Sequence, residues 1–411
     1  MEATISLLLP ATGGLYDPRG IPAALADTAR AILDPSGLGA PPHHLPFISE
    51  VARRRRHVFV PADHRFKAAA RFLQALWRED RGLPIGTHID RVNPQRIRRL
   101  GSRMSIAAGR TGANFMTPDI AAVAARALAY REPGAAYDIS RLRTNLLSSQ
   151  PLVFNLFGPL ARDQALATRF VAELIPDALT SVTDVLFEHS PGRGDPRFTA
   201  DRTAFDVVIR GTTSTGARAL ICVEVKYSEA GHDAGAPLHP RHAEIACTTP
   251  GLFIAPDDPA LTGPACQQLH RQHCLASAML AAGLADNATL AFIAPAHNQL
   301  ANAAAATYTR QLADPAAGPI PFVPLTLEHA FTAMAAAGQP TYAAALHRRY
   351  TDWWLLDGEL ELALTATAAD APLPNIATVS PALIDAPFVA NPAPRKRPQR
   401  VRPATRTSAV A

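Results

Sequence analysis

Two apolar runs joined by one short polar turn constrain the fold of this chain more than any other feature. The run AFDVVIR, residues 204–210, is followed by the turn GTTSTGAR and then by ALICVEVKYS, residues 219–228. Runs rich in Val and Ile that flank a turn of Gly, Thr and Ser are typical of a β-hairpin. The sequence therefore predicts an antiparallel hairpin near the middle of the chain.

The segments that flank this hairpin complete an α-β-β-β-α-β order. The patterns predict a helix over residues 160–175, a strand over 181–188, a long helix over 264–282 and a fourth strand over 288–295. A fifth strand is expected at 320–326, and a loop of about 35 residues precedes the long helix. This order predicts an α/β fold with a mixed central sheet and helices packed on its faces.

Three regions are predicted along the 411 residues. Residues 1–150 show helical patterns and are expected to form a mainly helical N-terminal region. Residues 151–365 carry the α/β pattern. Residues 366–411 are rich in Pro, end in a basic stretch and lack apolar periodicity, so we expect a disordered tail.

Charge is distributed unevenly along the chain. The net charge is +5, yet residues 386–411 carry six basic residues and no acidic one, which leaves the rest of the chain at about −1. The basic tail fits either an electrostatic arm for nucleic-acid phosphates or a solubilising extension. No stretch approaches the roughly 20 apolar residues of a membrane helix, and the N-terminus lacks the features of a signal peptide. We therefore expect a cytoplasmic protein without a membrane partner.

Lysine is scarce in this chain, which makes one lysine informative. Of the 40 basic residues only three are lysine, namely Lys67, Lys226 and Lys396. Lys226 lies in the apolar second run of the hairpin. A lysine ammonium is compact and can lose its proton when it is desolvated, whereas a guanidinium stays charged. Lys226 is therefore expected to have a chemical role that arginine cannot take.

Side chains alternate along a strand, so Glu224 and Lys226 face the same way. Antiparallel pairing across the turn would bring Asp206 to the same end of the hairpin. Two carboxylates with a few waters form a minimal cage for Mg²⁺, which prefers oxygen ligands. Such an ion would polarise a phosphodiester and acidify an attacking water, while Lys226 would hold or deprotonate that water. The pattern predicts a hydrolytic site for phosphodiesters.

Asp206, seventeen residues, and then Glu224-Val225-Lys226 within this order resemble the PD-(D/E)XK nucleases. Segments such as FLQALWREDRGLPIG and VEVKYSE, within residues 65 to 355, are similar to bacterial members described as candidate restriction endonucleases. The resemblance implies a restriction-endonuclease-like core in residues 151–365 and metal-dependent cleavage of DNA. It implies Asp206 and Glu224 as ligands of Mg²⁺, for which Mn²⁺ can substitute, and Lys226 as the catalytic lysine.

The resemblance also directs attention to neighbouring residues. Phe205 stands where the superfamily name has proline. Many members place a further glutamate on the first helix, and here Glu173 and Glu188 are both candidates. Related nucleases often have a glutamine near the metal on the helix after the third strand, so Gln268 and Arg271 are expected to contact substrate.

The leading hypothesis is a Mg²⁺-dependent endonuclease acting on DNA, in restriction or defence. A non-catalytic nucleic-acid-binding protein that retains the nuclease fold is the first alternative, and a DNA-repair exonuclease or junction nuclease is the second. The run RRRR at 53–56 fits either a phosphate-binding stretch or a solvated surface. A homodimer is compatible with the sequence.

Overall fold

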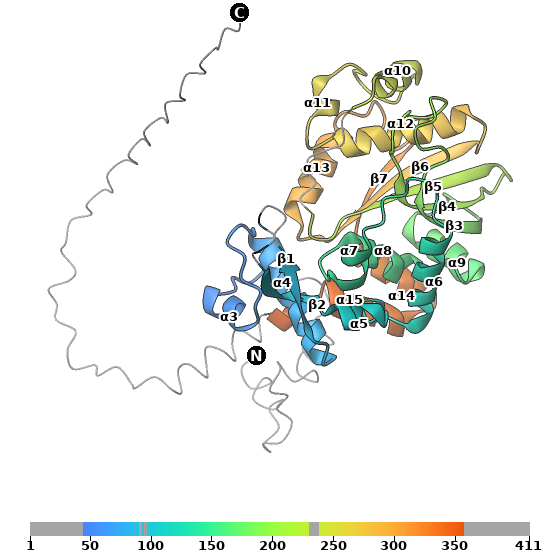
Figure 1. Cartoon of the computed structure of the whole chain (residues 1–411). Helices are drawn as coiled ribbons and strands as arrows, with labels where there is room; N and C mark the ends of the chain where they lie inside the picture. The colour runs from blue at the N-terminus through green and yellow to red at the C-terminus, as the bar shows by residue number, and fades with distance from the viewer. Residues whose placement is uncertain (1–43, 90–92, 94, 96, 230–237, 357–411) are drawn as a thin grey trace, which may run out of the picture. The chain divides into compact units, whose positions relative to one another are not determined.

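The predicted hairpin forms the centre of a five-stranded sheet in the computed structural model, which describes residues 44–89, 93, 95, 97–229 and 238–356 (Figure 1). Its strands are β3 (Ser181–His189), β4 (Phe205–Thr212), β5 (Arg218–Val225), β6 (Asn287–Ala294) and β7 (Phe322–Thr326). They lie in the order β3-β4-β5-β6-β7. The pairs β3–β4 and β4–β5 are antiparallel, whereas β5–β6 and β6–β7 are parallel. The predicted mixed sheet is confirmed.

Two helices complete the α-β-β-β-α-β core. Helix α9 (Gln164–Leu174) precedes β3, and α12 (Gln267–Ala281) lies between β5 and β6. The side chain of Asp163 caps α9 by accepting a hydrogen bond from the backbone of Leu166, as an N-cap aspartate is expected to do. Leu166 and Phe170 lie four residues apart and both are buried, so one stripe of α9 packs against the sheet. The predicted mixed α/β fold class is confirmed.

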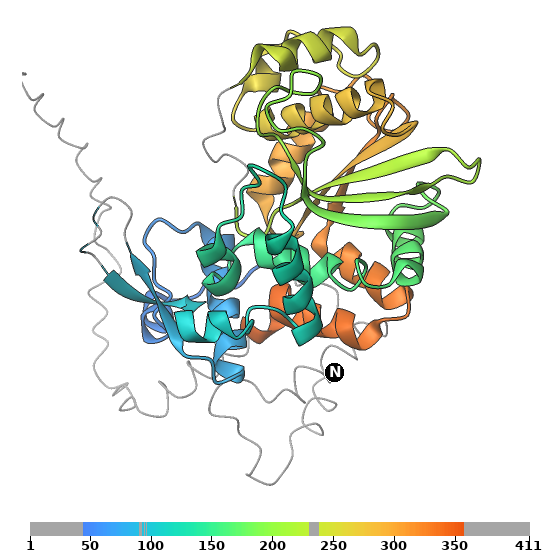
Figure 2. The same ribbon diagram turned by 45° about the vertical axis from the view of Figure 1, so that its right-hand side comes forward.

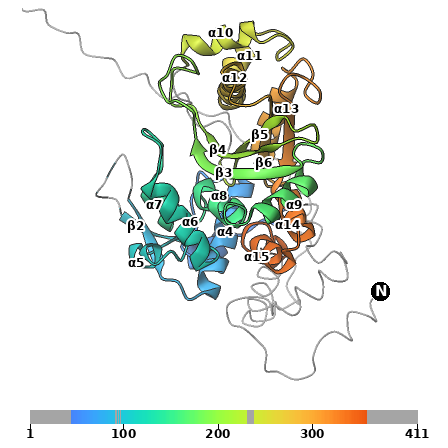
Figure 3. The same ribbon diagram turned by 90° about the vertical axis from the view of Figure 1, so that its right-hand side faces the viewer.

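The alternation of side chains on the central strands separates two layers of the core. Val207 on β4 and Val223 on β5 pack with α8 (Ser149–Phe157), α9 and α14 (Leu327–Ala336). Val208 and Cys222 pack on the other face, with α10 (Pro240–Thr248) and α12. Figures 2 and 3 show α10 and α12 on one side of the sheet and α8, α9 and α14 on the other. Glu224 follows the parity of Cys222 and therefore faces α12.

The N-terminal region contains a small sheet that its sequence did not reveal. Its elements are α3 (Glu50–Arg55), α4 (Arg65–Asp80), β1 (Ile85–Ile89), β2 (Ile97–Met104), α5 (Ile106–Arg110), α6 (Pro118–Ala129) and α7 (Ile139–Thr144). β1 and β2 pair antiparallel. Burial along β2 changes from exposed to buried midway, without alternation, because only its second half packs on α4. The sequence of β2 therefore lacks a period of two, and the mainly helical N-terminal region also contains one hairpin.

The segment between β5 and α12 also differs from its prediction. Where the sequence suggested a loop of about 35 residues, the described part contains α10 and the short α11 (Pro259–Thr262). Each has Pro in its first turn and a side-chain cap from the preceding residue, His239 or Asp258. These are local start signals that the short length of the helices made easy to overlook.

The remaining helices are α13 (Gln299–Thr309) and α15 (Pro340–Tyr350). Among the described residues, no helix combines the length and the apolar character needed to cross a membrane.

One hydrophobic core includes residues on both sides of residue 150. Phe66 on α4 packs edge-on against Trp353, with ring centroids 5.5 Å apart, and both belong to the cluster that covers the sheet. Every described residue falls in the compact unit Met1–Thr365. The boundary at 150 stays a prediction, and the predicted tail, 366–411, lies outside the described residues.

Candidate active site

The β4–β5 pairing brings the predicted carboxylates to one end of the hairpin. Val207 lies opposite Val223. Asp206, which precedes Val207, and Glu224, which follows Val223, are therefore neighbours across the antiparallel pair. The Oδ2 atom of Asp206 accepts a hydrogen bond of 2.9 Å from the backbone N–H of Val225. The approach of Asp206 to Glu224, which the sequence could only infer from an assumed register, is therefore present in the structure.

Lys226 follows the last residue of β5 and reaches the same place. Its Nζ lies 2.7 Å from Oε1 of Glu224 and 2.6 Å from Oε1 of Gln268. The backbone N–H of Lys226 donates to Ile293 on β6 at 2.8 Å, which continues the parallel pairing beyond the strand. The side chain is 13% exposed. An ammonium with two oxygen partners is thus held between β5 and α12.

Two glutamines of α12 hold the Glu224 carboxylate. The Nε2 group of Gln268 donates to Oε1 of Glu224 at 2.7 Å, and Nε2 of Gln272 donates to Oε2 at 2.6 Å. Gln272 also donates to the carbonyl of Ala204 at 3.1 Å, just before β4. Gln272 was missed in the sequence. Its signal is the spacing of four residues from Gln268, which places both on one face of a helix.

Arg271 lines the same pocket but stays apart from these carboxylates. Its Nη1 atom lies 3.9 Å from Oδ2 of Asp201. Asp201 in turn accepts hydrogen bonds from the Thr199 hydroxyl and from the backbone and hydroxyl of Thr203. The Nε atom of Arg271 is buried and has no hydrogen-bond partner among the described residues. Arg271 is therefore placed in the wall of the pocket, next to Asp201 and apart from Asp206 and Glu224.

The structure brings Glu188, and not Glu173, to this site. Glu188 lies near the end of β3 and lines the pocket together with Asp206 and Glu224. Its backbone has a φ of 48°, a left-handed conformation that non-glycine residues adopt rarely. Glu173 is exposed on α9. The choice between them depended on how β3 ends, which local sequence did not reveal.

These groups line a pocket of about 590 Å³. Its walls come from the end of β3, the loop before β4, the ends of the hairpin and one face of α12. The lining residues are Glu188, Gly194, Ala200, Asp201, Arg202, Thr203, Ala204, Asp206, Glu224, Gln268, Arg271 and Gln272.

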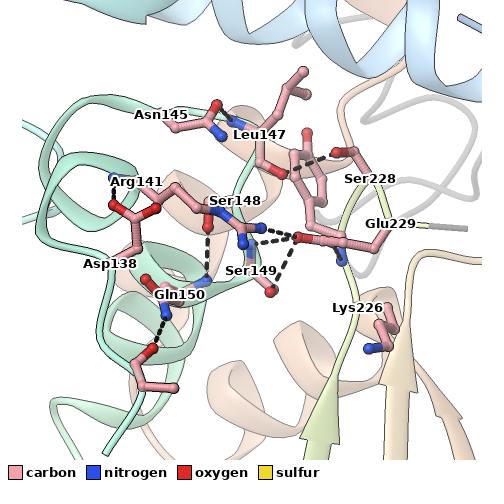
Figure 4. Close-up of polar contacts among 12 residues, drawn as sticks. Asp138, Arg141, Asn145, Leu147, Ser148, Ser149, Gln150, Lys226, Ser228 and Glu229 are labelled. Atoms are coloured by element: carbon pink, nitrogen blue, oxygen red, sulfur yellow. Dashed lines mark hydrogen bonds and ion pairs between the residues drawn. The ribbon is translucent and has the colours of Figure 1, made fainter. Parts of the chain in front are cut away.

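The chain after Lys226 is tied to the N-terminal region. Figure 4 shows the carboxylate of Glu229 beside the start of α8, where Oε1 accepts hydrogen bonds of 3.1 Å from both the backbone and the hydroxyl of Ser149. The hydroxyl of Ser228 donates to the carbonyl of Leu147 at 2.9 Å. These contacts fix the backbone two and three residues beyond Lys226, so residues before 150 help to position the site.

Burial and like charge shift the acidities of the cluster. Burial raises the pKa of Asp206 well above its ordinary value, and the neighbouring carboxylates of Glu224 and Glu188 raise it further. Burial likewise raises the pKa of Glu188, and the charge of Glu224 adds to this rise. Burial acts to lower the pKa of Lys226, but Glu224 and Asp206 outweigh it, and the pKa is raised. The lysine is therefore held charged, and the carboxylates repel one another.

The donor set fits a hard cation bound by two carboxylates and waters. Within the described residues, no group of three or more His, Cys, Asp or Glu side chains is arranged to hold a metal ion. Asp206 and Glu224 nevertheless offer the oxygen ligands that Mg²⁺ prefers. Oδ2 of Asp206 and Oε2 of Glu224 each accept one hydrogen bond and keep a second lone pair for a cation. A cation there would relieve the repulsion that raises the pKa of Asp206.

An α-β-β-β-α-β core that joins Asp206 and Glu224-x-Lys226 at the end of its central hairpin defines a restriction-endonuclease-like protein. The comparison with protein families agrees, because a model of the PD-(D/E)XK nuclease superfamily matches residues 61–352. The chain belongs to this superfamily of hydrolytic nucleases, as its sequence predicted. No curated protein and no solved structure gives a significant match.

Proposed function

We propose that this protein is a Mg²⁺-dependent endonuclease that hydrolyses phosphodiester bonds of DNA. The observation that carries the proposal is the convergence of Asp206, Glu224 and Lys226, in which the lysine Nζ lies 2.7 Å from Glu224 and both carboxylates line one pocket. Membership of the nuclease superfamily supports a nucleic-acid substrate. The sequence resemblance supports a role in restriction or defence.

In this proposal, Asp206 and Glu224 are the metal ligands. Bound Mg²⁺ supplies Lewis-acid polarisation of the scissile phosphate and a more acidic water, and Mn²⁺ can substitute for it. Gln268 and Gln272 hold the Glu224 carboxylate in one orientation. Because both ends of the Gln268 amide already bond Glu224 and Lys226, we assign Gln268 a positioning role as well as a place in the substrate pocket.

Lys226 acts as a hydrogen-bond donor and as a positive charge. Its raised pKa favours orienting the attacking water and stabilising the charge that develops on phosphoryl oxygens over removing a proton. Arg271, which lines the catalytic pocket, is proposed to bind a phosphate of the substrate next to the scissile one through its terminal nitrogens. A guanidinium is well suited to this contact because its donors match phosphate oxygens in pairs.

Cleavage assays with matched variants test the site. Purified protein is incubated with supercoiled plasmid, linear duplex and single-stranded DNA in Mg²⁺ or Mn²⁺. We expect D206A, E224A and K226A each to lower the cleavage rate by about 10²-fold or more. The control is E173A, whose side chain is exposed on α9 and which should cleave like the wild type. Undiminished cleavage by all three site variants would refute the assignment.

The substrates also separate the alternatives. Nicking or linearisation of covalently closed plasmid identifies an endonuclease, because such a plasmid has no ends. Stepwise shortening of end-labelled linear DNA, with plasmid untouched, would identify an exonuclease instead. Binding without cleavage at any metal concentration would support a non-catalytic protein, and a parallel assay on RNA of the same sequence tests the choice of DNA.

A further inference from the structure

A second pocket, lined by arginines, lies in the N-terminal region outside the catalytic pocket. It has a volume of about 210 Å³ and is formed by the end of α3 and by β2. We name it the arginine pocket. Its lining residues are Arg54, His57, Phe59, Arg98, Arg99 and Leu100. Arg98 and Arg99 are exposed.

Close backbone contact builds this pocket. The N–H of Gly101 on β2 donates to the carbonyl of His57 at 2.8 Å. A Cβ atom at Gly101 would lie 2.2 Å from the carbonyl oxygen of Arg56, so only glycine permits this approach. The guanidinium groups of Arg53 and Arg54 lie 4.9 and 4.2 Å from the centroid of the Phe59 ring. The arginines of α3 are thereby held beside those of β2.

Positive charge around the arginine pocket is not balanced. In the described part of the chain, the carboxylates that pair with these arginines are Glu50, with Arg54 at 2.6 Å, and Glu79, with Arg56 and Arg78. Neither Arg98 nor Arg99 has an acidic partner among those residues. Of the three arginines that line the pocket, only Arg54 has a carboxylate partner within the described residues.

The excess has an electrostatic consequence inside the protein. Burial lowers the pKa of Arg78; Glu79 acts against this lowering, and Arg56 and Arg99 add to it. Positive groups are thus close enough to repel one another, at a cost that bound anions would relieve. Guanidinium groups bind phosphate oxygens in pairs and are weakly hydrated, which suits them to phosphate recognition.

We propose that the arginine pocket binds phosphodiester groups of the nucleic-acid backbone. The inference rests on the proposed nuclease function for the identity of its ligand, because the substrate then carries a continuous row of phosphates. Contacts of this kind contribute affinity and orientation, and they carry no information about base sequence. The role of the RRRR run at 53–56 was open between phosphate binding and a solvated surface. Arg54, the member of this run that lines the pocket, is thereby assigned to phosphate binding.

Salt-dependent binding of the full chain tests the proposal. Affinity for a fluorescent 30-base-pair DNA duplex is measured in EDTA, where cleavage cannot proceed, over a series of salt concentrations. For R98A/R99A we expect about tenfold weaker binding at low salt. We expect the slope of log K against log salt to become shallower by about 1.8, since each phosphate contact contributes about 0.9. An RNA duplex of the same sequence shows which backbone is preferred.

The control is R131A/R310A, which removes the same charge from exposed arginines just after α6 and at the end of α13. It should leave the slope unchanged. Thermal unfolding of both double variants should match the wild type, because all four side chains are exposed. If R98A/R99A keeps the wild-type affinity and salt slope, the proposal that the arginine pocket binds phosphates is wrong. Failure of the nuclease proposal would give a different result, namely intact DNA binding without metal-dependent cleavage.

Discussion

Lys226 illustrates why a side chain can be specified by its shape as well as by its charge. The space between Oε1 of Glu224 and Oε1 of Gln268 holds a single nitrogen at 2.7 and 2.6 Å. A planar guanidinium carries its donors on a wider fork and cannot place one nitrogen between these two atoms without moving them. This geometry explains why a lysine stands at this position in a chain that otherwise uses arginine almost throughout.

This geometry predicts that K226R does not preserve activity. We expect the cleavage rate to fall by about 10²-fold, because the donor aimed at the developing charge is displaced. DNA binding in EDTA should persist, since the positive charge is kept. Single-turnover cleavage at saturating DNA measures the effect, and K67R, which changes a lysine of α4 remote from the pocket, is the control. Wild-type turnover by K226R would show that charge alone is sufficient.

Asp206 predicts a link between pH, metal and stability. Its folded pKa is raised above the unfolded value, so its contribution to stability is present at low pH and is lost as pH rises through the folded pKa. We expect D206N to stabilise the metal-free protein at pH 8 by on the order of 1 kcal/mol and to have little effect at pH 4. The amide oxygen can still accept from Val225.

Thermal unfolding in EDTA at several pH values measures this difference. Mg²⁺ should then stabilise the wild type and leave D206N nearly unchanged. A difference between the two proteins that does not grow with pH would contradict the raised pKa of Asp206.

The pairing of α12 with β5 sets the orientation of the candidate metal ligand. Gln268 and Gln272 each donate to one oxygen of Glu224. The orientation of this carboxylate is therefore set by a helix that begins more than 40 residues later in the sequence. Groups that orient a ligand contribute to metal affinity without contacting the metal.

We therefore expect Q272A to weaken Mn²⁺ binding by about 10- to 100-fold. Calorimetric titration of Mn²⁺ measures this directly, and added metal should restore part of the cleavage rate because the ligands themselves remain. The matched control is Q299A, an exposed glutamine at the start of α13. Loss of cleavage in Q272A with unchanged Mn²⁺ affinity would argue against a role through Glu224.

A buried arginine connects the N-terminal region to the last described helix. Arg349 on α15 is fully buried and donates to the backbone and side-chain oxygens of Asn114 at 2.8 and 2.5 Å. Its guanidinium lies 3.9 Å from the centroid of the Trp77 ring on α4. The nuclease core and the N-terminal helices are thereby joined by polar contacts as well as by a shared hydrophobic core.

R349A should lower the free energy of unfolding by about 3 kcal/mol or more, because it leaves buried acceptors unpaired and creates a cavity. The neighbouring R348A removes a partly exposed arginine whose carboxylate partners lie 3.9 Å away, and it should cost less than about 1 kcal/mol. Urea unfolding of the two variants measures the contrast. Equal, small losses in the free energy of unfolding would show that Arg349 is not needed to join the N-terminal helices to the nuclease core.

The sequence by itself determined the strands of the sheet, the side-chain parity of Glu224 and Lys226, and the superfamily, because periodicity and spacing are local properties of the chain. The tertiary structure alone decided that Glu188 reaches the pocket and Glu173 does not, and that Gln272 holds Glu224. It also decided that β2 meets α3 to gather the arginines. These outcomes depend on how elements distant in the chain pack and where each strand ends, which no local pattern encodes.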